Sequence, residues 1–159
     1  MSYLLDANVF IEASRRYYGF DLVPQFWDWL IDAHSRGVVM TVQQVADEIT
    51  PGDELHNWFS QLPPTFVEPH TSAVATEVGV LSAWAIGHGF TQAAINTFMG
   101  SADLWLIAQA RAHGHTVVSH ETLINLDRRN AVKIPNVCAA NGVACIDTFD
   151  LWRRDAGTP

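Results

Sequence analysis

A chain of 159 residues with 48% hydrophobic content, six Trp and eight Phe can build the core of one folded unit, and we expect residues 1–159 to form a single domain. The formal net charge of −8 argues against a nucleic-acid binder with a broad basic surface, because a negative field repels phosphates. No apolar run approaches the ~18 to 20 residues that cross a bilayer, and the start lacks a secretion-signal pattern, so we expect a cytoplasmic protein without membrane contact.

The first residues predict a strand, an acid and a helix in succession. The apolar run 3–5 ends at Asp6, and residues 7–14 carry a helix-compatible pattern. The aromatic segment 17–20 breaks that pattern, so it is interpreted as a loop.

The next segment predicts a helix, a second buried strand and another helix. Pro24 opens a strongly amphipathic pattern that ends at Gly37, and residues 38–40 form a short apolar run. Thr41 is a fair N-cap for the following helix, whose buried face would carry Val42, Val45, Ala46 and Ile49. Glu48 lies on the flank of that face, so we expect it beside the core rather than in open solvent.

The middle of the chain is predicted to be helical, over residues 53–61, 72–86 and 91–98. Ser101 then provides an N-cap for a helix from Asp103 to His113. Apolar side chains nearly surround this helix, so we expect it to be central.

Two further strands, residues 116–119 and 143–146, and a closing helix through Trp152 complete the pattern. The strands alternate with helical segments, and each connection is too long for a hairpin. The predicted fold is therefore an α/β sandwich with a mainly parallel central sheet between layers of helices.

Four acidic residues occupy comparable places in this pattern. Asp6 ends the first strand, and Glu48 lies on the helix after the second strand. Asp103 is in the first turn of the central helix, and Glu121 follows the strand 116–119. Functional sites of open α/β sheets lie beyond the carboxyl ends of the strands, so we expect the four carboxylates to converge.

The order and spacing of these acids resemble the PIN-domain (PilT N-terminus) family. Its first motif, an apolar strand followed by Asp, any residue and Asn or Ser, is matched by residues 4–8. Its Glu after a strand and a Thr is matched by residues 41–49, and its Asp opening an alanine-rich helix by residues 103–110. Its fourth motif is matched by residues 117–121, where Glu121 replaces the usual Asp.

This resemblance implies a PIN-like three-layer α/β/α sandwich and a metal-dependent endoribonuclease similar to the VapC-type toxins of type II toxin-antitoxin systems. It also implies an RNA substrate, a cognate antitoxin protein and a homodimer. Hard carboxylate oxygens suit Mg²⁺ or Mn²⁺, and a bound cation would reverse the local charge where a phosphate must lie.

The resemblance also assigns roles to individual residues. The catalytic and metal-binding set is Asp6, Glu48, Asp103 and Glu121, with Asp6 and Asp103 as direct ligands and the two glutamates acting through metal-bound waters. The residues that orient these carboxylates would be Asn8, Ser101 and Ser119.

Other interpretations of the same residues stay open. The domain could be a catalytically weak or inactive PIN-like binding module, because fold does not determine function. Taken singly, Asp103 could complement a helix dipole and the two glutamates could be solvated surface charges. A phosphatase with a nucleophilic Asp after the first strand is disfavoured, because Asn8 stands where the second Asp of such enzymes is needed.

Cationic and aromatic residues near the predicted rim suit phosphate contact and base stacking, or they surround a folded loop as solvated charges. They form two groups, 15–18 and Arg128, Arg129 and Lys133. His120 is a candidate for substrate contact, whereas His113 and His115 flank a helix end and fit a helix-terminal role better than metal ligation.

The remaining conspicuous residues favour packing roles. Cys138 and Cys145 have no companion pair, which argues against a disulfide framework or a zinc site and favours buried hydrophobic side chains. The six tryptophans fit a core or a dimer interface better than a nucleotide platform.

Overall fold

The computed structural model describes residues 1–122 and 128–156. A four-stranded sheet runs through the molecule in the order β2-β1-β3-β4, and all its strands are parallel. The strands are β1 (Tyr3–Leu5), β2 (Val39–Met40), β3 (Thr116–Val118) and β4 (Cys145–Ile146). The predicted parallel sheet between helices is confirmed.

The strand β1 lies inside the sheet and has a parallel neighbour on each side. Leu4 is in register with Met40 of β2 on one side and with Val117 of β3 on the other. In such a sheet the connections after β1 and β3 diverge, and a crevice opens beyond the carboxyl ends of these two strands. The Asp6 amide donates to the Val118 carbonyl at 3.0 Å, which fixes the start of this crevice.

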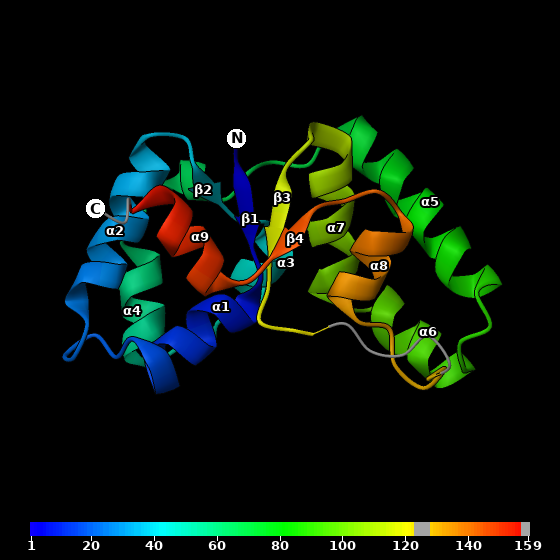
Figure 1. Cartoon of the computed structure of the whole chain (residues 1–159), viewed down its shortest axis with the longest axis horizontal. Coiled ribbons are helices and arrows are strands. Elements are labelled where there is room, and N and C mark those ends of the chain that lie inside the picture. Colours follow the sequence, from blue (N-terminus) through cyan, green and yellow to red (C-terminus); the bar gives the residue numbers. More distant parts are fainter. Residues whose placement is uncertain (123–127, 157–159) are drawn as a thin grey trace.

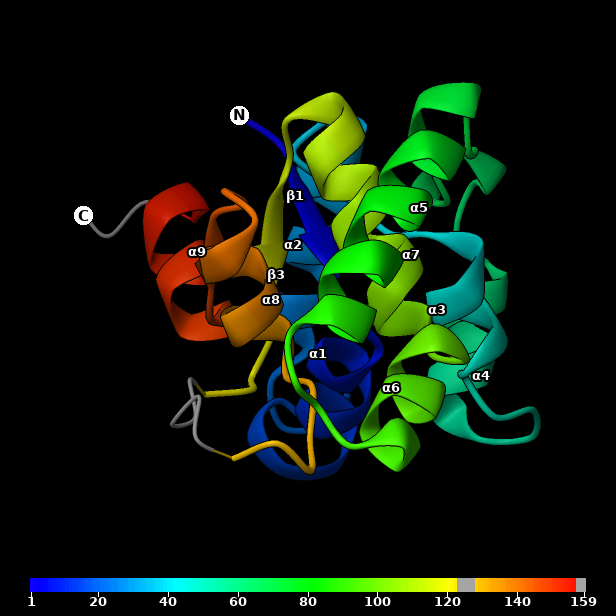
Figure 2. The same ribbon diagram turned by 90° about the vertical axis from the view of Figure 1, so that its right-hand side faces the viewer.

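Helices cover both faces of the sheet (Figures 1 and 2). One layer contains α1 (Ala7–Glu12), α2 (Pro24–Ser35), α4 (Glu54–Ser60) and α9 (Thr148–Asp155). The other contains α5 (Ser72–Gly87), α6 (Gln92–Met99), α7 (Ala102–His113) and α8 (Ile134–Ala140). The short helix α3 (Gln43–Asp47) packs against α7.

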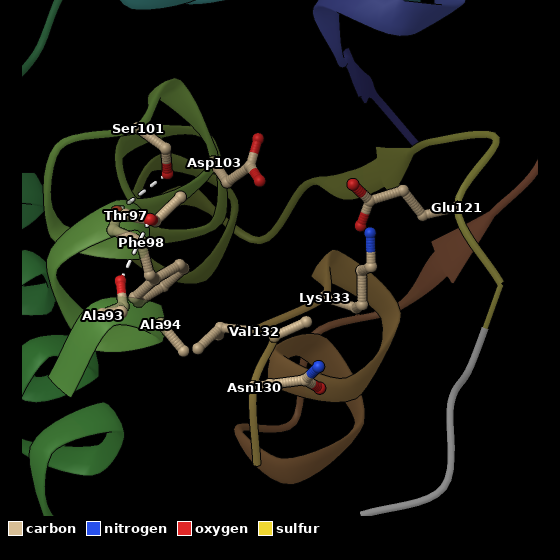
Figure 3. A pocket seen from close by; sticks show the side chains of 11 residues that line it. Ala93, Ala94, Thr97, Phe98, Ser101, Asp103, Glu121, Asn130, Val132 and Lys133 are labelled. Atoms are coloured by element: carbon tan, nitrogen blue, oxygen red, sulfur yellow. Dashed lines mark hydrogen bonds between the residues drawn. The ribbon is translucent and has the colours of Figure 1, made fainter. Parts of the chain in front are cut away.

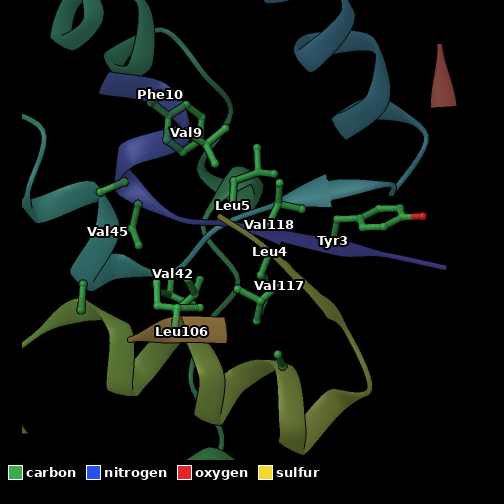
Figure 4. Close-up of a cluster of buried hydrophobic side chains, with 14 of the residues drawn as sticks. Tyr3, Leu4, Leu5, Val9, Phe10, Val42, Val45, Leu106, Val117 and Val118 are labelled. Atoms are coloured by element: carbon green, nitrogen blue, oxygen red, sulfur yellow. The ribbon is translucent and has the colours of Figure 1, made fainter. Parts of the chain in front are cut away.

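The core forms on both faces of β1, because successive side chains of a strand point in opposite directions. Leu4 and Val117 point toward Leu106 of α7 (Figure 4), and all three are fully buried. The helix α7 buries seven of its residues, so its predicted central position is confirmed. Truncating Leu4 to Ala would leave a cavity and cost about 2–5 kcal/mol of stability.

Aromatic rings fill the layer around α2 and α9. Phe20 stacks on Trp27 with ring centroids 4.0 Å apart, and Tyr18 stacks on Phe26 at 4.4 Å. All six tryptophans are either part of the hydrophobic core or packed against it, as the sequence predicted.

Several local features differ from what the sequence predicted. The aromatic loop was predicted to begin at Tyr17, but the π-helix η1 (Ala13–Tyr17) prolongs α1 through that residue. Thr41 does not cap α3, since its hydroxyl donates to the Leu5 carbonyl at 2.7 Å and so joins the ends of β2 and β1. The helix α8 was not predicted, because seven residues with a proline in the first turn carry too little periodicity.

The connection between β2 and α5 contains one 3-10 turn, η2 (Pro64–Phe66).

Cys138 is buried and Cys145 is half-buried, and neither forms a disulfide. In the part of the chain that the structure describes, no helix is long and apolar enough to cross a bilayer.

Candidate functional site

Asp6 is a carboxylate held inside the protein at the carboxyl end of β1. Only 2% of the residue is exposed, because it stands between the buried strand and the buried first turn of α1. The Ser119 hydroxyl donates to its Oδ2 at 3.3 Å. Burial, reinforced by the negative charges of Asp103 and Glu121, raises the pKa of Asp6 to about 8.

Asp103 reaches the same region from the first turn of α7. Partial burial raises its pKa to about 7, with further contributions from the negative charges of Glu121 and Glu48. The Lys133 ammonium opposes this shift and lowers the pKa of Asp103. Asp103 therefore interacts electrostatically with each of the other three predicted acids.

Glu121 is fixed by backbone groups on both sides. Its amide donates to the Ser119 hydroxyl at 3.1 Å, and its Oε2 accepts the Ile134 amide at 2.8 Å. Ile134 is the first residue of α8, so Glu121 caps that helix. The carboxylate points into the same space as that of Asp103 (Figure 3).

Glu48 follows α3 and is more exposed than its helical pattern predicted. Desolvation of its carboxylate still raises its pKa, and a hydrogen bond from the Ala102 amide acts in the opposite direction. Ala102 is the first residue of α7, and the N-cap residue Ser101 makes no side-chain capping hydrogen bond to this helix. The Ser101 hydroxyl instead donates to the Phe98 carbonyl at 2.7 Å.

The three predicted orienting residues have different surroundings. Ser119 is buried and bridges Asp6 to the Glu121 amide, the position expected of an orienting group. Ser101 stands two residues before Asp103 in sequence and lines the same cavity, but its hydroxyl contacts Phe98. Asn8 is exposed on α1, and within residues 1–122 and 128–156 its side chain makes no hydrogen bond.

The donor set fits a hard divalent cation with few direct protein ligands. Among the described residues, no group of three or more His, Cys, Asp or Glu side chains is arranged to hold a metal ion. Glu121 also accepts the Ile134 amide, which removes part of its capacity to bind a cation. Mg²⁺ usually takes one or two carboxylates directly and keeps several waters, so Asp6 and Asp103 would be sufficient as direct ligands.

A cavity of about 320 Å³ adjoins Asp103 and Glu121 and extends toward α6. Its wall includes Thr97, Phe98 and Asn130, which were not singled out from the sequence. No motif marks these three, because they lie on α6 and on the connection into α8, the helix that the sequence did not predict.

Aromatic residues surround His120, the neighbour of Glu121 in sequence. The exposed Tyr17 ring lies 5.3 Å from His120 and 5.4 Å from Phe149. Burial lowers the pKa of His120, and its Nε2 lies 3.0 Å from the Thr148 hydroxyl. His120 is therefore neutral at pH 7 and belongs to an aromatic rim of the site.

The predicted cationic residues are only partly free to contact a ligand. Arg16 pairs with Glu12 at 3.2 Å, while Arg15 is exposed. Arg129 donates to the His88 carbonyl at 2.6 Å and so holds the connection after α5. Lys133 lines the cavity beside the acids.

A second polar cluster lies at the opposite, amino-terminal edge of the sheet. Gln109 is fully buried, and its Nε2 donates to Glu68 at 2.7 Å and to the Pro69 carbonyl at 3.2 Å. Glu68 also pairs with His115 at 2.9 Å, and His70 Nδ1 lies 2.7 Å from Gln109 Oε1. His113, at the end of α7, contacts the Thr71 hydroxyl at 3.2 Å.

The fold and this site define an α/β protein with a parallel sheet and a cluster of carboxylates beyond the carboxyl ends of β1 and β3. The chain belongs to the family described as "Domain of unknown function (DUF4411)", whose model matches residues 3–158. No curated protein and no solved structure matches the chain significantly.

Proposed function

We propose that this protein is a metal-dependent endoribonuclease resembling the toxin of a type II toxin-antitoxin system. The observation that carries the proposal is the burial of Asp6 beside two other carboxylates, Asp103 and Glu121, at the switch point of a parallel sheet. Buried like charges are costly unless a cation compensates them. The resemblance of the four acidic motifs to the PIN-domain family supports the same activity.

In this proposal the side chains of the site divide the work. Asp6 and Asp103 hold Mg²⁺ or Mn²⁺ directly, and Ser119 keeps the Asp6 carboxylate in one orientation. When bound, the cation supplies an activated water and stabilises the charge that develops on the phosphate. Glu48 and Glu121 would complete the acidic ring through waters, and Glu121 also caps α8.

The rim of the site supplies contacts for a single-stranded RNA. Tyr17 and Phe149 offer aromatic surfaces, and Arg15 is an exposed cation on η1. The protein carries a net charge of −8, so we expect RNA to bind at this local surface with the cation in place rather than over the whole molecule.

The proposal extends to partners and location. A cognate antitoxin would inhibit the enzyme by covering the acidic crevice, and two copies of the chain would form a homodimer. A cytoplasmic location, where RNA and the antitoxin are present, belongs to the same proposal.

One observation favours a second candidate, a PIN-like binding module without appreciable catalysis. Glu121 accepts a backbone amide at the start of α8, so it has a structural reason to be acidic or polar. Under this alternative the site would bind RNA or a protein and leave phosphodiester bonds intact.

The discriminating experiment is incubation of the purified protein with labelled single-stranded RNA and Mn²⁺, with and without chelator. We expect cleavage that requires the metal and is abolished by Asp6→Asn. Asp47→Asn is the matched control, because Asp47 is an exposed acid on α3 that hydrogen-bonds only Gln43 among the described residues. Equal cleavage by wild type and Asp6→Asn would contradict the nuclease proposal, and RNA binding without cleavage would favour the binding module.

A further inference from the structure

The cavity beside Asp103 and Glu121 has the size of a small-molecule site. Its volume of about 320 Å³ lies at the lower end of the ~300–1,000 Å³ that is typical of ligand pockets. Figure 3 shows the carboxylates of Asp103 and Glu121 at one end and side chains of α6 and of the segment before α8 around the rest.

The cavity walls carry different chemistry at its two ends. Lys133 places an ammonium group beside the acids, close enough to lower the pKa of Asp103. Among the described residues no ion pair of 4 Å or less occupies this ammonium. A lysine in this position can contact a phosphate that is also drawn to a cation held by the acids.

The far end of the cavity is largely apolar. Phe98 of α6 and Val132 line this end, where Val132 packs against the cluster that contains Ala94. The Thr97 hydroxyl and the Asn130 amide are at its border (Figure 3). A nucleobase has matching properties, since its faces are apolar and its edge carries hydrogen-bond donors and acceptors. The Thr97 hydroxyl already donates to the Ala93 carbonyl at 3.0 Å, which leaves its oxygen as an acceptor.

We propose that this cavity is the subsite for one nucleotide next to the phosphate that is cleaved. Lys133 contacts the nucleotide's phosphate, the base lies between Phe98 and Val132, and Asn130 contacts the edge of the base. The inference rests on the proposed function and deepens it, because a base can enter the cavity only when it is unstacked. The substrate class is therefore single-stranded RNA or an unpaired loop.

The test fills the cavity from an exposed position. Ala93 lines the cavity but is itself exposed on α6, so Ala93→Phe places a ring in the cavity without replacing a core residue. Ala75→Phe is the matched control, because Ala75 is an exposed residue of the helix α5 and does not line the cavity. Thermal melting and a manganese titration of each variant would verify that the fold and the acidic site are intact.

The probes are the four nucleoside 5′-monophosphates, titrated in the presence of Mn²⁺ and followed by ligand-observed NMR. Binding to wild type is expected to weaken at least about 10-fold in Ala93→Phe because the ring excludes the base, and to be unchanged in Ala75→Phe. Lys133→Gln is the second variant. It should weaken binding of the monophosphates about 10-fold and leave binding of the nucleosides unchanged.

The possible results separate this inference from the nuclease proposal. If wild type binds no mononucleotide, or Ala93→Phe binds as well as Ala75→Phe, the subsite is refuted even if the protein cleaves RNA. If the expected pattern of binding is found but RNA stays intact, the cavity remains a nucleotide site and the nuclease proposal fails. If both succeed, mapping the cleaved bonds should show a base preference that Ala93→Phe alters and Ala75→Phe retains.

Discussion

Buried polar side chains occur at both edges of the sheet, but their neighbours differ. At one edge the neighbours are hydrogen-bond partners, and at the other they are groups of like charge. At the amino-terminal edge, Glu68 faces His115 and receives a hydrogen bond from Gln109, which in turn contacts His70. At the carboxyl edge, Asp6 and Asp103 face further acids.

The first cluster satisfies its own hydrogen bonds, so it needs only the folded chain to be stable. The second cluster combines burial with like charge, so its ionised form is favoured only when a cation joins it. Burial alone therefore does not distinguish a structural polar cluster from a ligand site. The sign of the neighbouring charges does.

The largest expected effect is on metal affinity. Asp103→Asn should weaken Mn²⁺ binding about 100-fold or more, because it removes a direct carboxylate ligand and one of the charges that attract the ion. Isothermal titration calorimetry would measure it. Glu68→Gln is the matched control at the other edge and should bind Mn²⁺ as wild type does; equal loss in both variants would contradict the distinction between the edges.

A large effect on stability is expected at the opposite edge. Gln109→Leu should lower the free energy of unfolding by about 2–4 kcal/mol, since it leaves Glu68 and His70 without their shared buried partner. Chemical denaturation would measure this change. Affinity for Mn²⁺ should be retained, and a stability equal to wild type would show that the cluster is dispensable.

The two edges should also differ in their pH dependence. The folded-state pKa of about 8 for Asp6 and about 7 for Asp103 lies above the ordinary 3.8, so the folded protein holds these protons more tightly than the unfolded chain. The stability that the tightly held protons of Asp6 and Asp103 contribute is complete below pH 3.8. It is lost as the pH rises through the folded-state pKa values of about 7 and 8.

Metal-free protein should therefore have a melting temperature about 5 °C lower at pH 9 than at pH 6. This difference corresponds to a loss of about 2 kcal/mol in the free energy of unfolding. Mn²⁺ at pH 8.5 should restore much of the loss. The variant Asp6→Asn should flatten this part of the profile, and an unchanged slope in that variant would show that other groups cause it.

The smallest effect concerns the cap of α8. Glu121→Gln keeps an oxygen that can accept the Ile134 amide, whereas Glu121→Ala removes it. The alanine variant should be less stable than the glutamine variant by about 1 kcal/mol, the usual value of a helix cap. Urea denaturation of the pair would measure this difference, and equal stabilities would mean that the capping bond contributes nothing.

The predictable part of the fold is the part that carries periodic apolar runs. The segments around Leu4 and Val117 and the helix α7 carry strong local patterns, and the order of strands and helices implied a parallel sheet. The helix α8 was not predictable in this way, because it is short and its start depends on a side chain 13 residues earlier, Glu121.

The candidate site was predictable as a set of residues but not in its hydrogen bonds. Asp6 and Glu121 follow strands, and Asp103 lies in the first turn of the central helix α7, so their approach follows from the topology of a parallel sheet. The capping bond of Glu121, and the turn of Ser101 toward Phe98, depend on how separate elements meet. The wall of the cavity at Phe98 and Asn130 depends on the same tertiary contacts.

The outer strands of the sheet limit how another molecule can attach. β2 and β4 have only two residues each, and the end of β2 is already bridged at Thr41 to Val67. Such short outer strands offer few free backbone groups for an added strand, a feature that protects proteins against edge-to-edge aggregation. A binding protein would therefore have to contact the helices or the surface side chains rather than add a strand to the sheet.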